Sequence, residues 1–219
     1  MSEPALKAMI VPVTPIEQNC TLIWCTRTMK AAVIDPGGDV PRIKAALGQA
    51  GVTVEKILLT HGHIDHAGAA KPLADELGVQ IEGPHEDDRF WLERLEEDGA
   101  RWGIVGVPFE PDRWLNDGDT VTVGDLTLDV YHTPGHTAGH VIFHHPPSNF
   151  AQVGDVLFQG SVGRTDLPQG NHQQLVNSIV TKLWPLGAET AFIPGHGKPS
   201  TFGHERQWNM FVSDDALSD

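Results

Sequence analysis

Three predicted β-strands of this 219-residue chain end in a corner that combines glycine with histidine, and this repeat constrains the fold more than any other feature. The corners are Thr60-His61-Gly62-His63, Thr133-Pro134-Gly135-His136 and Ile193-Pro194-Gly195-His196. Strand ends that meet at one edge of a layered domain can aim their imidazoles at a common point. We therefore expect segments far apart in the sequence to converge on one histidine-rich site.

Strand and helix patterns alternate along both halves of the chain. Apolar or β-branched runs predict strands at Met9–Val13, Thr21–Cys25, Ala32–Ile34, Val54–Leu59, Thr120–Val123, Leu126–Tyr131, Val141–Phe143, Phe150–Val153 and Ala191–Ile193. Helical spacing predicts helices between Asp39 and Gly51, from about Ala67–Ala69 to Leu77, around Phe90–Leu95, and after Asn171 as far as Leu183. Sheet elements with helices in both halves favour an α/β fold in which helices cover a pair of packed sheets.

The composition is that of an ordinary soluble protein, with 40% hydrophobic and 20% charged residues. We expect residues 1–219 to form a single domain. No run reaches the roughly 18 apolar residues of a membrane helix, and the first residues lack the pattern of a signal peptide. Cys20 and Cys25 lie five apart in one predicted strand, so they point to opposite faces and cannot pair. These features predict a cytoplasmic protein.

The segment Thr60–His66 carries four potential metal ligands within six residues. These ligands are His61, His63, Asp65 and His66. Neutral imidazoles and a carboxylate suit Zn²⁺, Fe²⁺ or Mn²⁺, and Gly62 permits a tight turn that lets neighbouring side chains converge. His61 and His63 would share one face of a strand, whereas Asp65 and His66 would lie near the start of the following helix. This arrangement can divide the four ligands between two metal ions. The alternative, a polar loop with solvated histidines, does not explain this density.

Three further candidate ligands stand alone in the sequence. They are His136, Asp155 and His196. Each could instead be a surface turn residue, and that alternative is strongest for Asp155 because aspartate is common in turns. His132 and His140 flank the first of the three and could support it, but we assign them, with the remaining histidines, to packing or surface roles.

Together, the spacing His-x-His-x-Asp-His, then Gly-His, Gly-Asp and a last Gly-His, resembles the metallo-β-lactamase superfamily. Within it, the chain is most similar to the short, single-domain glyoxalase II-like hydrolases of the YcbL type. The supporting stretches are Gln18–Cys20, Asp35–Gly38, Leu59–His63, Gly160–Asp166 and Ile193–Gly197. The resemblance implies an αββα sandwich of two packed mixed β-sheets flanked by helices, with metal ions at one edge of the sheets. It implies no C-terminal helical substrate domain of the kind that larger glyoxalase II enzymes have.

The resemblance also implies a role for each ligand. It implies a first metal ion on His61, His63 and His136, a second on Asp65, His66 and His196, and Asp155 as the bridge between them. Zinc is expected at both positions, with iron or manganese as alternatives. Many lactam-cleaving members carry a cysteine ligand near the bridging region, and its absence here favours the hydrolase branch. Asp35 resembles a carboxylate that orients a metal-bound imidazole, with a β-turn role before Pro36 as an equal alternative.

The reaction implied is thioester hydrolysis, with S-lactoylglutathione (a hydroxyacylglutathione) cleaved to glutathione and a 2-hydroxy acid. A hydroxide bridging the two metals would attack, with Asp65 and Asp155 as the catalytic carboxylates. The alternative is a persulfide dioxygenase of the same fold, with one Fe²⁺ on His61, His136 and Asp155 and with glutathione persulfide as substrate. Gly163–Asp166 is shared with that branch, whereas the Pro194–Gly197 corner is more similar to the hydrolases.

The expected partner is a small molecule, a glutathione conjugate. In glyoxalase II-like enzymes a basic residue at the place of Arg164 contacts glutathione, and arginine can bind a carboxylate through two parallel hydrogen bonds. Arg164 is therefore the one substrate-binding residue that we predict, with a salt bridge to Asp166 as the alternative. The net charge of −14 opposes a nucleic-acid substrate, and no membrane partner is expected. Seven ligands for two ions leave positions for water, which opposes a purely structural metal module.

Overall fold

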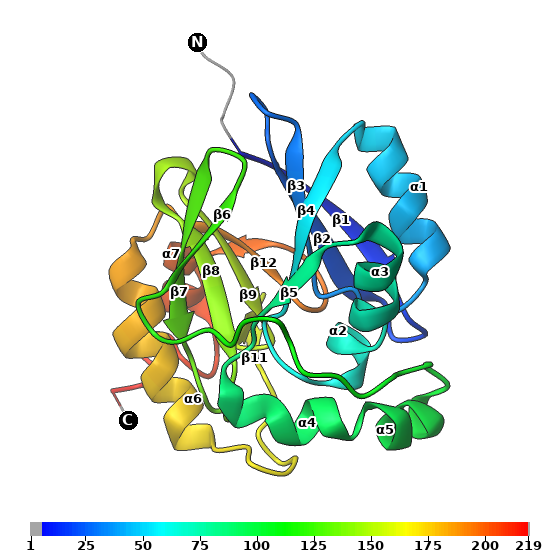
Figure 1. The fold of residues 1–219 in the computed structure, drawn as a ribbon. Coiled ribbons are helices and arrows are strands. Elements are labelled where there is room, and N and C mark those ends of the chain that lie inside the picture. The colour runs from blue at the N-terminus through cyan, green and yellow to red at the C-terminus, as the bar shows by residue number, and fades with distance from the viewer. Residues whose placement is uncertain (1–5, 219) are drawn as a thin grey trace.

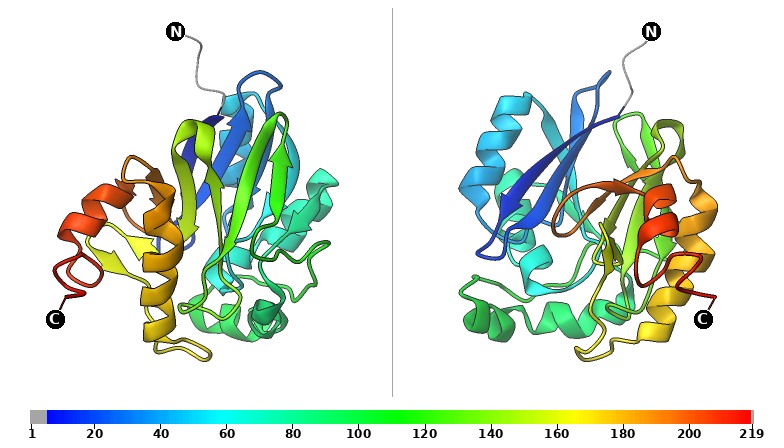
Figure 2. Two further views of the ribbon diagram at one scale, coloured as in Figure 1. Left: turned by 90° about the vertical axis from the view of Figure 1, so that its left-hand side faces the viewer. Right: turned by 180° about the vertical axis from the view of Figure 1, so that it is seen from behind.

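The computed structural model describes residues 6–218, which form two β-sheets packed face to face with helices on both outer sides (Figures 1 and 2). The first sheet has the order β1 (Leu6–Val13), β2 (Gln18–Cys25), β3 (Lys30–Ile34), β4 (Thr53–Leu58) and β5 (Gln80–Glu82). Its first three strands pair antiparallel and its last three pair parallel. The parallel pairs require helical crossovers. These are α1 (Val40–Ala50), and then α2 (Ile64–Ala67) with α3 (Ala70–Leu77).

The second sheet is also mixed. Its order is β13 (Ser200–Thr201), β12 (Ala191–Pro194), β9 (Phe150–Gly154), β8 (Val141–His145), β7 (Leu126–His132) and β6 (Thr120–Val123). The strands pair antiparallel except β12 with β9. The crossover between these two contains the short hairpin β10 (Leu157–Phe158) and β11 (Ser161–Val162), followed by α6 (His172–Ser178), a π-helical turn (Ile179–Leu183) and a 3-10 turn (Trp184–Leu186). The last helix is α7 (Phe202–Trp208).

The link between the sheets carries a 3-10 turn, η1 (Glu86–Asp88), and two short helices, α4 (Arg89–Glu93) and α5 (Leu95–Trp102). In Figure 1 these helices lie across the lower end of the molecule, near α2. Another 3-10 turn, Pro146–Ser148, joins β8 to β9.

Three apolar layers hold the sandwich together. The outer layer of the first sheet packs Leu22 and Ile57 against Leu73 and other residues of α1, α3 and α5. The middle layer joins the two sheets and includes Ile23 and Phe143. The third layer packs the second sheet against α6 and α7. Helix, sheet, sheet and helix thus follow one another, and the predicted αββα sandwich of two mixed sheets is confirmed.

The alternation of side chains along β2 settles the prediction about the two cysteines. Cys20 lies in the outer layer and Cys25 in the layer between the sheets, so the two thiols face opposite sides of the strand. Both are buried and free. The prediction that they cannot pair with each other is confirmed.

Some helix boundaries differ from those predicted. The helix expected from about Ala67–Ala69 to Leu77 is preceded by the separate short helix α2, and Pro72 lies in the first turn of α3, where proline is tolerated. The helix predicted after Asn171 begins there, and Asn171 caps it, since its side chain accepts a hydrogen bond from the Gln174 amide. Asp39 precedes α1 but does not cap it, because its carboxylate accepts from the Thr14 amide instead. Across residues 6–218, none of the helices combines the length and the apolar character needed to cross a membrane.

Candidate metal centre

The seven predicted ligands lie together at one edge of the two sheets. They are carried by the loop after β4 (His61, His63), by α2 (Asp65, His66), by the loop after β7 (His136), and by the turns after β9 (Asp155) and β12 (His196). All are buried except His196, which is half-buried. Four strand ends thus converge, as the Gly-His corners predict.

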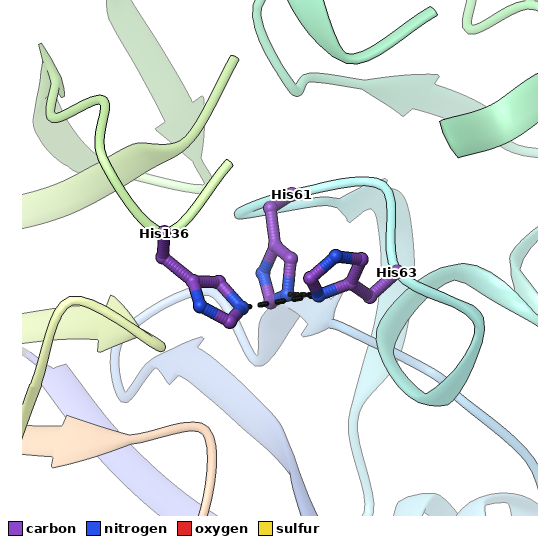
Figure 3. Close-up of side chains that lie close together, drawn as sticks. All are labelled: His61, His63 and His136. Carbon is purple, nitrogen blue, oxygen red and sulfur yellow. Dashed lines mark hydrogen bonds between the residues drawn. The ribbon is translucent and has the colours of Figure 1, made fainter. Parts of the chain in front are cut away.

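The first cluster contains His61, His63 and His136, whose rings point toward one another in Figure 3. His61 Nε2 lies 3.1 Å from His63 Nδ1, and His136 Nε2 lies 3.0 Å from the same nitrogen. Three imidazole nitrogens this close can share one ion, because Zn–N bonds of about 2.0–2.1 Å bring the ligands of one ion to similar separations.

Hydrogen bonds on the far side of the rings fix which nitrogen carries the lone pair. His136 Nδ1 donates to the Arg164 carbonyl at 2.7 Å. Thr60 Oγ1 donates to Asp35 Oδ2 at 2.6 Å, so it accepts from His61 Nδ1 at 3.1 Å. Both histidines therefore turn an unprotonated Nε2 toward the cluster.

The pKa values of these histidines favour the neutral form that binds metal. Burial, reinforced by the neighbouring His136, lowers the pKa of His63 to about 3. Burial also lowers the pKa of His61 well below its usual range. For His136, burial outweighs the opposing carboxylate of Asp155 and lowers the pKa. No proton has to be displaced from these rings at neutral pH before a cation binds.

The second cluster contains Asp65, His66 and His196. His196 Nε2 lies 3.0 Å from Asp65 Oδ2, and His66 Nε2 lies 3.5 Å from the same oxygen. Burial disfavours a charge on His66, but Asp155 and Asp65 outweigh burial and raise its pKa well above the usual value. In the absence of a cation, the carboxylates thus pull a proton onto this ring.

Asp155 lies between the two clusters. Its Oδ1 is 3.4 Å from His66 Nε2, and its Oδ2 is 3.6 Å from His136 Nε2 and 3.8 Å from His196 Nε2. Burial would raise the pKa of Asp155, but the adjacent histidines, His66 first, hold it well below its usual range. An ionised carboxylate in this place can face an ion in each cluster.

Two buried atoms at this junction, His66 Nε2 and Asp155 Oδ1, lie 3.4 Å apart without forming a hydrogen bond, and neither has another hydrogen-bond partner within the described chain. Buried polar atoms without a partner are costly, and such atoms call for a water or an ion. Together with the converging lone pairs of the first cluster, they show that these residues fit a metal centre. The chain thus contains a His/Asp cluster that can bind metal ions.

Asp35 supports the metal centre through hydrogen bonds to Thr60 and His66. Its carboxylate is fully buried and accepts from the Thr60 amide at 2.7 Å, from the Thr60 hydroxyl, and from His66 Nδ1 at 2.9 Å. The last bond directs His66 Nε2 toward Asp65 and Asp155. Of the two roles left open for Asp35 by the sequence, this geometry matches the orienting carboxylate.

His140 has a larger role than the packing role expected from the sequence. Its Nε2 accepts a hydrogen bond from the Asp155 amide at 3.0 Å, and its ring stacks on His61 at 4.8 Å. It therefore supports one candidate ligand through the backbone and another through its ring. His132 lies farther out, and its Nε2 donates to the Ala138 carbonyl.

A cavity of about 710 Å³ opens over both clusters. Its floor includes His63, Asp65, His136, Asp155 and His196. The lining also includes Trp91, Arg94, Asp98, Arg101 and Trp102 from α4, α5 and the residue between them, together with Phe158, Val162, Arg164 and Leu167. The volume lies within the usual range of small-molecule sites.

Arg164 lines this cavity, and its guanidinium donates two hydrogen bonds to Asp166, at 2.8 and 2.7 Å. The structure thus contains the salt bridge that the sequence analysis gave as the alternative to a substrate contact. The sequence placed only Arg164 on the substrate side, but Arg94 and Arg101 line the same cavity. The sequence predicts a helix with two aromatic residues and Arg94 around Phe90–Leu95, but no local pattern indicates that this helix lies over the site.

Comparison with known proteins agrees with this geometry. The family model of the metallo-beta-lactamase superfamily matches residues 13–196. Hydroxyacylglutathione hydrolase GloC of Haemophilus influenzae is 43% identical over 93% of this chain and 97% of its own length. The crystal structure of BLEG-1 B3 metallo-beta-lactamase superposes with a TM-score of 0.87 at 34% identity, covering 94% of this chain and 99% of that one. TTHA1623, solved in a di-iron-bound form, gives a TM-score of 0.84 at 35% identity, with coverages of 93% and 100%.

Proposed function

This chain belongs to the metallo-β-lactamase superfamily, and we propose that it is a hydrolase that cleaves glutathione thioesters. S-lactoylglutathione is the substrate we propose first, with glutathione and a 2-hydroxy acid as products. The observation that carries the proposal is the pair of ligand clusters, joined by Asp155 and open to the cavity. The likeness to hydroxyacylglutathione hydrolase GloC over nearly the whole chain supports the choice of substrate.

The proposed cofactor is two divalent cations, zinc first and iron or manganese as alternatives. His61, His63 and His136 would hold one ion, Asp65, His66 and His196 the other, and Asp155 would contact both. When bound, such a pair of ions supplies a water of low pKa as nucleophile and polarises the substrate carbonyl. A relative that was solved in a di-iron-bound form supports a two-metal site and keeps iron among the alternatives.

The chain's own residues hold and orient the reacting groups. Asp65 and Asp155 both line the cavity, where their carboxylates can accept a hydrogen bond from the attacking water. His140 holds the backbone of Asp155, and Asp35 holds His66, so both groups are fixed before substrate enters. A thiolate leaving group has a pKa near 8.5, so the reaction needs no strong general acid from the protein.

Three arginines on the cavity walls support a substrate with carboxylates, such as a glutathione conjugate. Arg164 pairs with Asp166, Arg101 with Glu97, and Arg94 with Asp98. A substrate carboxylate can replace or share Asp166 or Glu97 at small cost, because these two ion pairs are exposed and exposed pairs contribute little. This arrangement supports Arg164 as a substrate contact and adds Arg94 and Arg101, which line the same cavity.

We further propose that the protein acts as a single domain in the cytoplasm. All three apolar layers of residues 6–218 belong to one sandwich, which supports a single folding unit. The two free, buried cysteines on opposite faces of β2 are compatible with a reducing compartment.

The substrate assignment is tested by a comparison of two thioesters. The metal-loaded protein is given S-lactoylglutathione and a neutral thioester that lacks the glycine carboxylate. We expect hydrolysis of both, with a lower KM for the glutathione conjugate. Equal KM values would remove the argument for glutathione, and no hydrolysis of either substrate would refute the proposed activity.

A further inference from the structure

A buried carboxylate outside the ligand clusters joins the two loops that carry the first cluster. Asp88, at the end of η1, is fully buried. It accepts hydrogen bonds from the Gly62 amide at 2.8 Å, from Thr137 Oγ1 at 2.8 Å and from the Gly139 amide at 2.6 Å. Gly62 lies between His61 and His63, and Thr137 directly follows His136.

The two loops lie directly against this segment. A Cβ atom at Gly62 would lie 2.8 Å from Trp91 Cβ and 3.1 Å from the Asp88 carbonyl oxygen. A Cβ atom at Gly139 would lie 2.4 Å from the Asp88 amide nitrogen. Real Cβ atoms do not approach so closely, so both positions need glycine because of their distance from Asp88 and Trp91. Gly62 does not have a positive φ, so this close approach, and not a left-handed backbone, requires glycine there.

The same segment also contacts a candidate ligand directly. Trp91, one turn after Asp88, is buried, and its indole meets the His63 ring edge-on with 4.4 Å between ring centroids. A single stretch of chain therefore fixes the backbone between two ligands, the backbone after a third, and the ring plane of one of them.

We propose that Asp88 is a positioning residue for the first metal site: it ties the Gly62 loop to the Thr137 loop and so holds His61, His63 and His136 in converging positions before an ion binds. This inference rests on the metal centre proposed above. The alternative is that Asp88 only stabilises the fold, with no influence on the site.

The cost of burying the Asp88 carboxylate favours a functional role for this residue. Burial raises the pKa of Asp88 to about 6, although all three hydrogen bonds oppose that change. Its ionised form is therefore less stable in the fold than in water at neutral pH. Buried groups that reduce stability are often retained for geometry at functional sites.

Three variants test the proposal. Asp88→Asn keeps the shape but replaces one acceptor oxygen with an NH₂ group that faces a donor, so at least one of the three bonds is lost. Thr137→Val removes the hydroxyl donor with little change of volume. Glu86→Gln is the matched control, because Glu86 is exposed in the same turn and its side chain pairs with Arg89.

Cobalt binding by each apoprotein is followed through the d–d absorption of Co²⁺ and by competition with a chelator. The Tm of each apoprotein is measured separately as the readout for stability. We expect Asp88→Asn to bind the first equivalent of Co²⁺ about 10- to 100-fold more weakly, with an altered spectrum. Thr137→Val should show a smaller loss in the same direction. The loss of affinity in the double variant should be smaller than the sum of the two single losses, and Glu86→Gln should match wild type.

Unchanged cobalt affinity and spectrum in Asp88→Asn and Thr137→Val, with only a lower Tm, would overturn the inference and leave Asp88 a stabilising residue. If Asp88→Asn does not fold, Thr137→Val alone decides, by the same criterion. A wild-type protein that binds no cobalt would instead refute the metal centre itself, so the two failures are distinguishable.

Discussion

Replacement of Asp35 by asparagine should weaken the second metal site more strongly than the first, because Asp35 contacts His66 directly but reaches His61 only through the Thr60 hydroxyl. The Asp35 carboxylate accepts from the Thr60 amide through Oδ1 and from His66 Nδ1 and the Thr60 hydroxyl through Oδ2. Asparagine has only one acceptor oxygen, and the backbone N–H of Thr60 can only donate a hydrogen bond. The amide oxygen therefore stays on Thr60, and the NH₂ group faces His66 Nδ1.

This exchange favours the wrong tautomer of His66. With a donor opposite Nδ1, the ring places its own proton on Nε2, which then points a hydrogen toward Asp65 and Asp155 instead of a lone pair. To bind a cation, the ring must give up the new hydrogen bond. A hydrogen bond to a charged group contributes about 1.5–3 kcal/mol, which corresponds to roughly a 10- to 150-fold loss of affinity for the second ion.

The backbone should tolerate the substitution. Asp35 has a positive φ of 53°, a left-handed conformation that asparagine adopts about as readily as aspartate. The free energy of unfolding of the apoprotein should therefore change less than the metal affinity does. Asp39→Asn is the matched control, because Asp39 also has a positive φ but lies away from the site and accepts from Thr14.

Elemental analysis after dialysis against a weak chelator measures the effect. At a chelator concentration that leaves two ions on wild type and on Asp39→Asn, we expect about one ion per chain on Asp35→Asn. Two ions held with wild-type affinity would refute the argument that Asp35 sets the tautomer of His66. Loss of both ions together with unfolding would show that Asp35 acts mainly on stability.

Three other substitutions give further tests. Asp155→Ala removes the carboxylate between the clusters, so metal content and thioester hydrolysis should be lost together; a variant that kept two ions and near-normal turnover would exclude Asp155 as the bridge. Arg164→Ala should raise KM for S-lactoylglutathione by roughly 2- to 5-fold with little change in kcat, because its side chain is 56% exposed and the contact is remote from the reacting carbon; an equal change with the neutral thioester would make Arg164 structural. Phe143→Ala opens the layer between the sheets and should lower the free energy of unfolding by about 3–5 kcal/mol in urea denaturation of the apoprotein; a loss below about 1 kcal/mol would contradict that packing.

The convergence of the candidate ligands was predictable because its signal is local. Four ligands fall within six residues, and the others follow Gly-His or Gly-Asp corners at strand ends, where backbone direction changes and side chains can turn to a common edge. The two sheets were predictable for a related reason, since strands such as Thr120–Val123 alternate apolar and polar residues. The sequence left two alternatives for Asp35, an orienting carboxylate or a β-turn residue, and its contact with His66, 31 residues away, matches the first.

The supporting and substrate-side residues had no such signal. Asp88 contacts Gly139 across 51 residues, and the two residues before it, Glu86 and Asp87, are exposed and acidic, as in a solvated turn. Arg94 and Arg101 lie on short helices whose placement over the cavity depends on tertiary packing. The hairpin β10–β11 has strands of two residues each, too short for any periodic pattern. These features depend on contacts that the spacing of residues does not encode.

The central claim, a two-metal thioester hydrolase, is tested most directly by one titration. The apoprotein is loaded stepwise with Zn²⁺ or Fe²⁺, and at each step the release of free thiol from S-lactoylglutathione and the uptake of oxygen with glutathione persulfide are measured on the same sample. We predict that thiol release rises to its maximum only as the metal content approaches about two ions per chain, with no oxygen uptake at any step. Oxygen uptake that saturates at one iron per chain, without thioester cleavage, would contradict the account and assign the site to a persulfide dioxygenase.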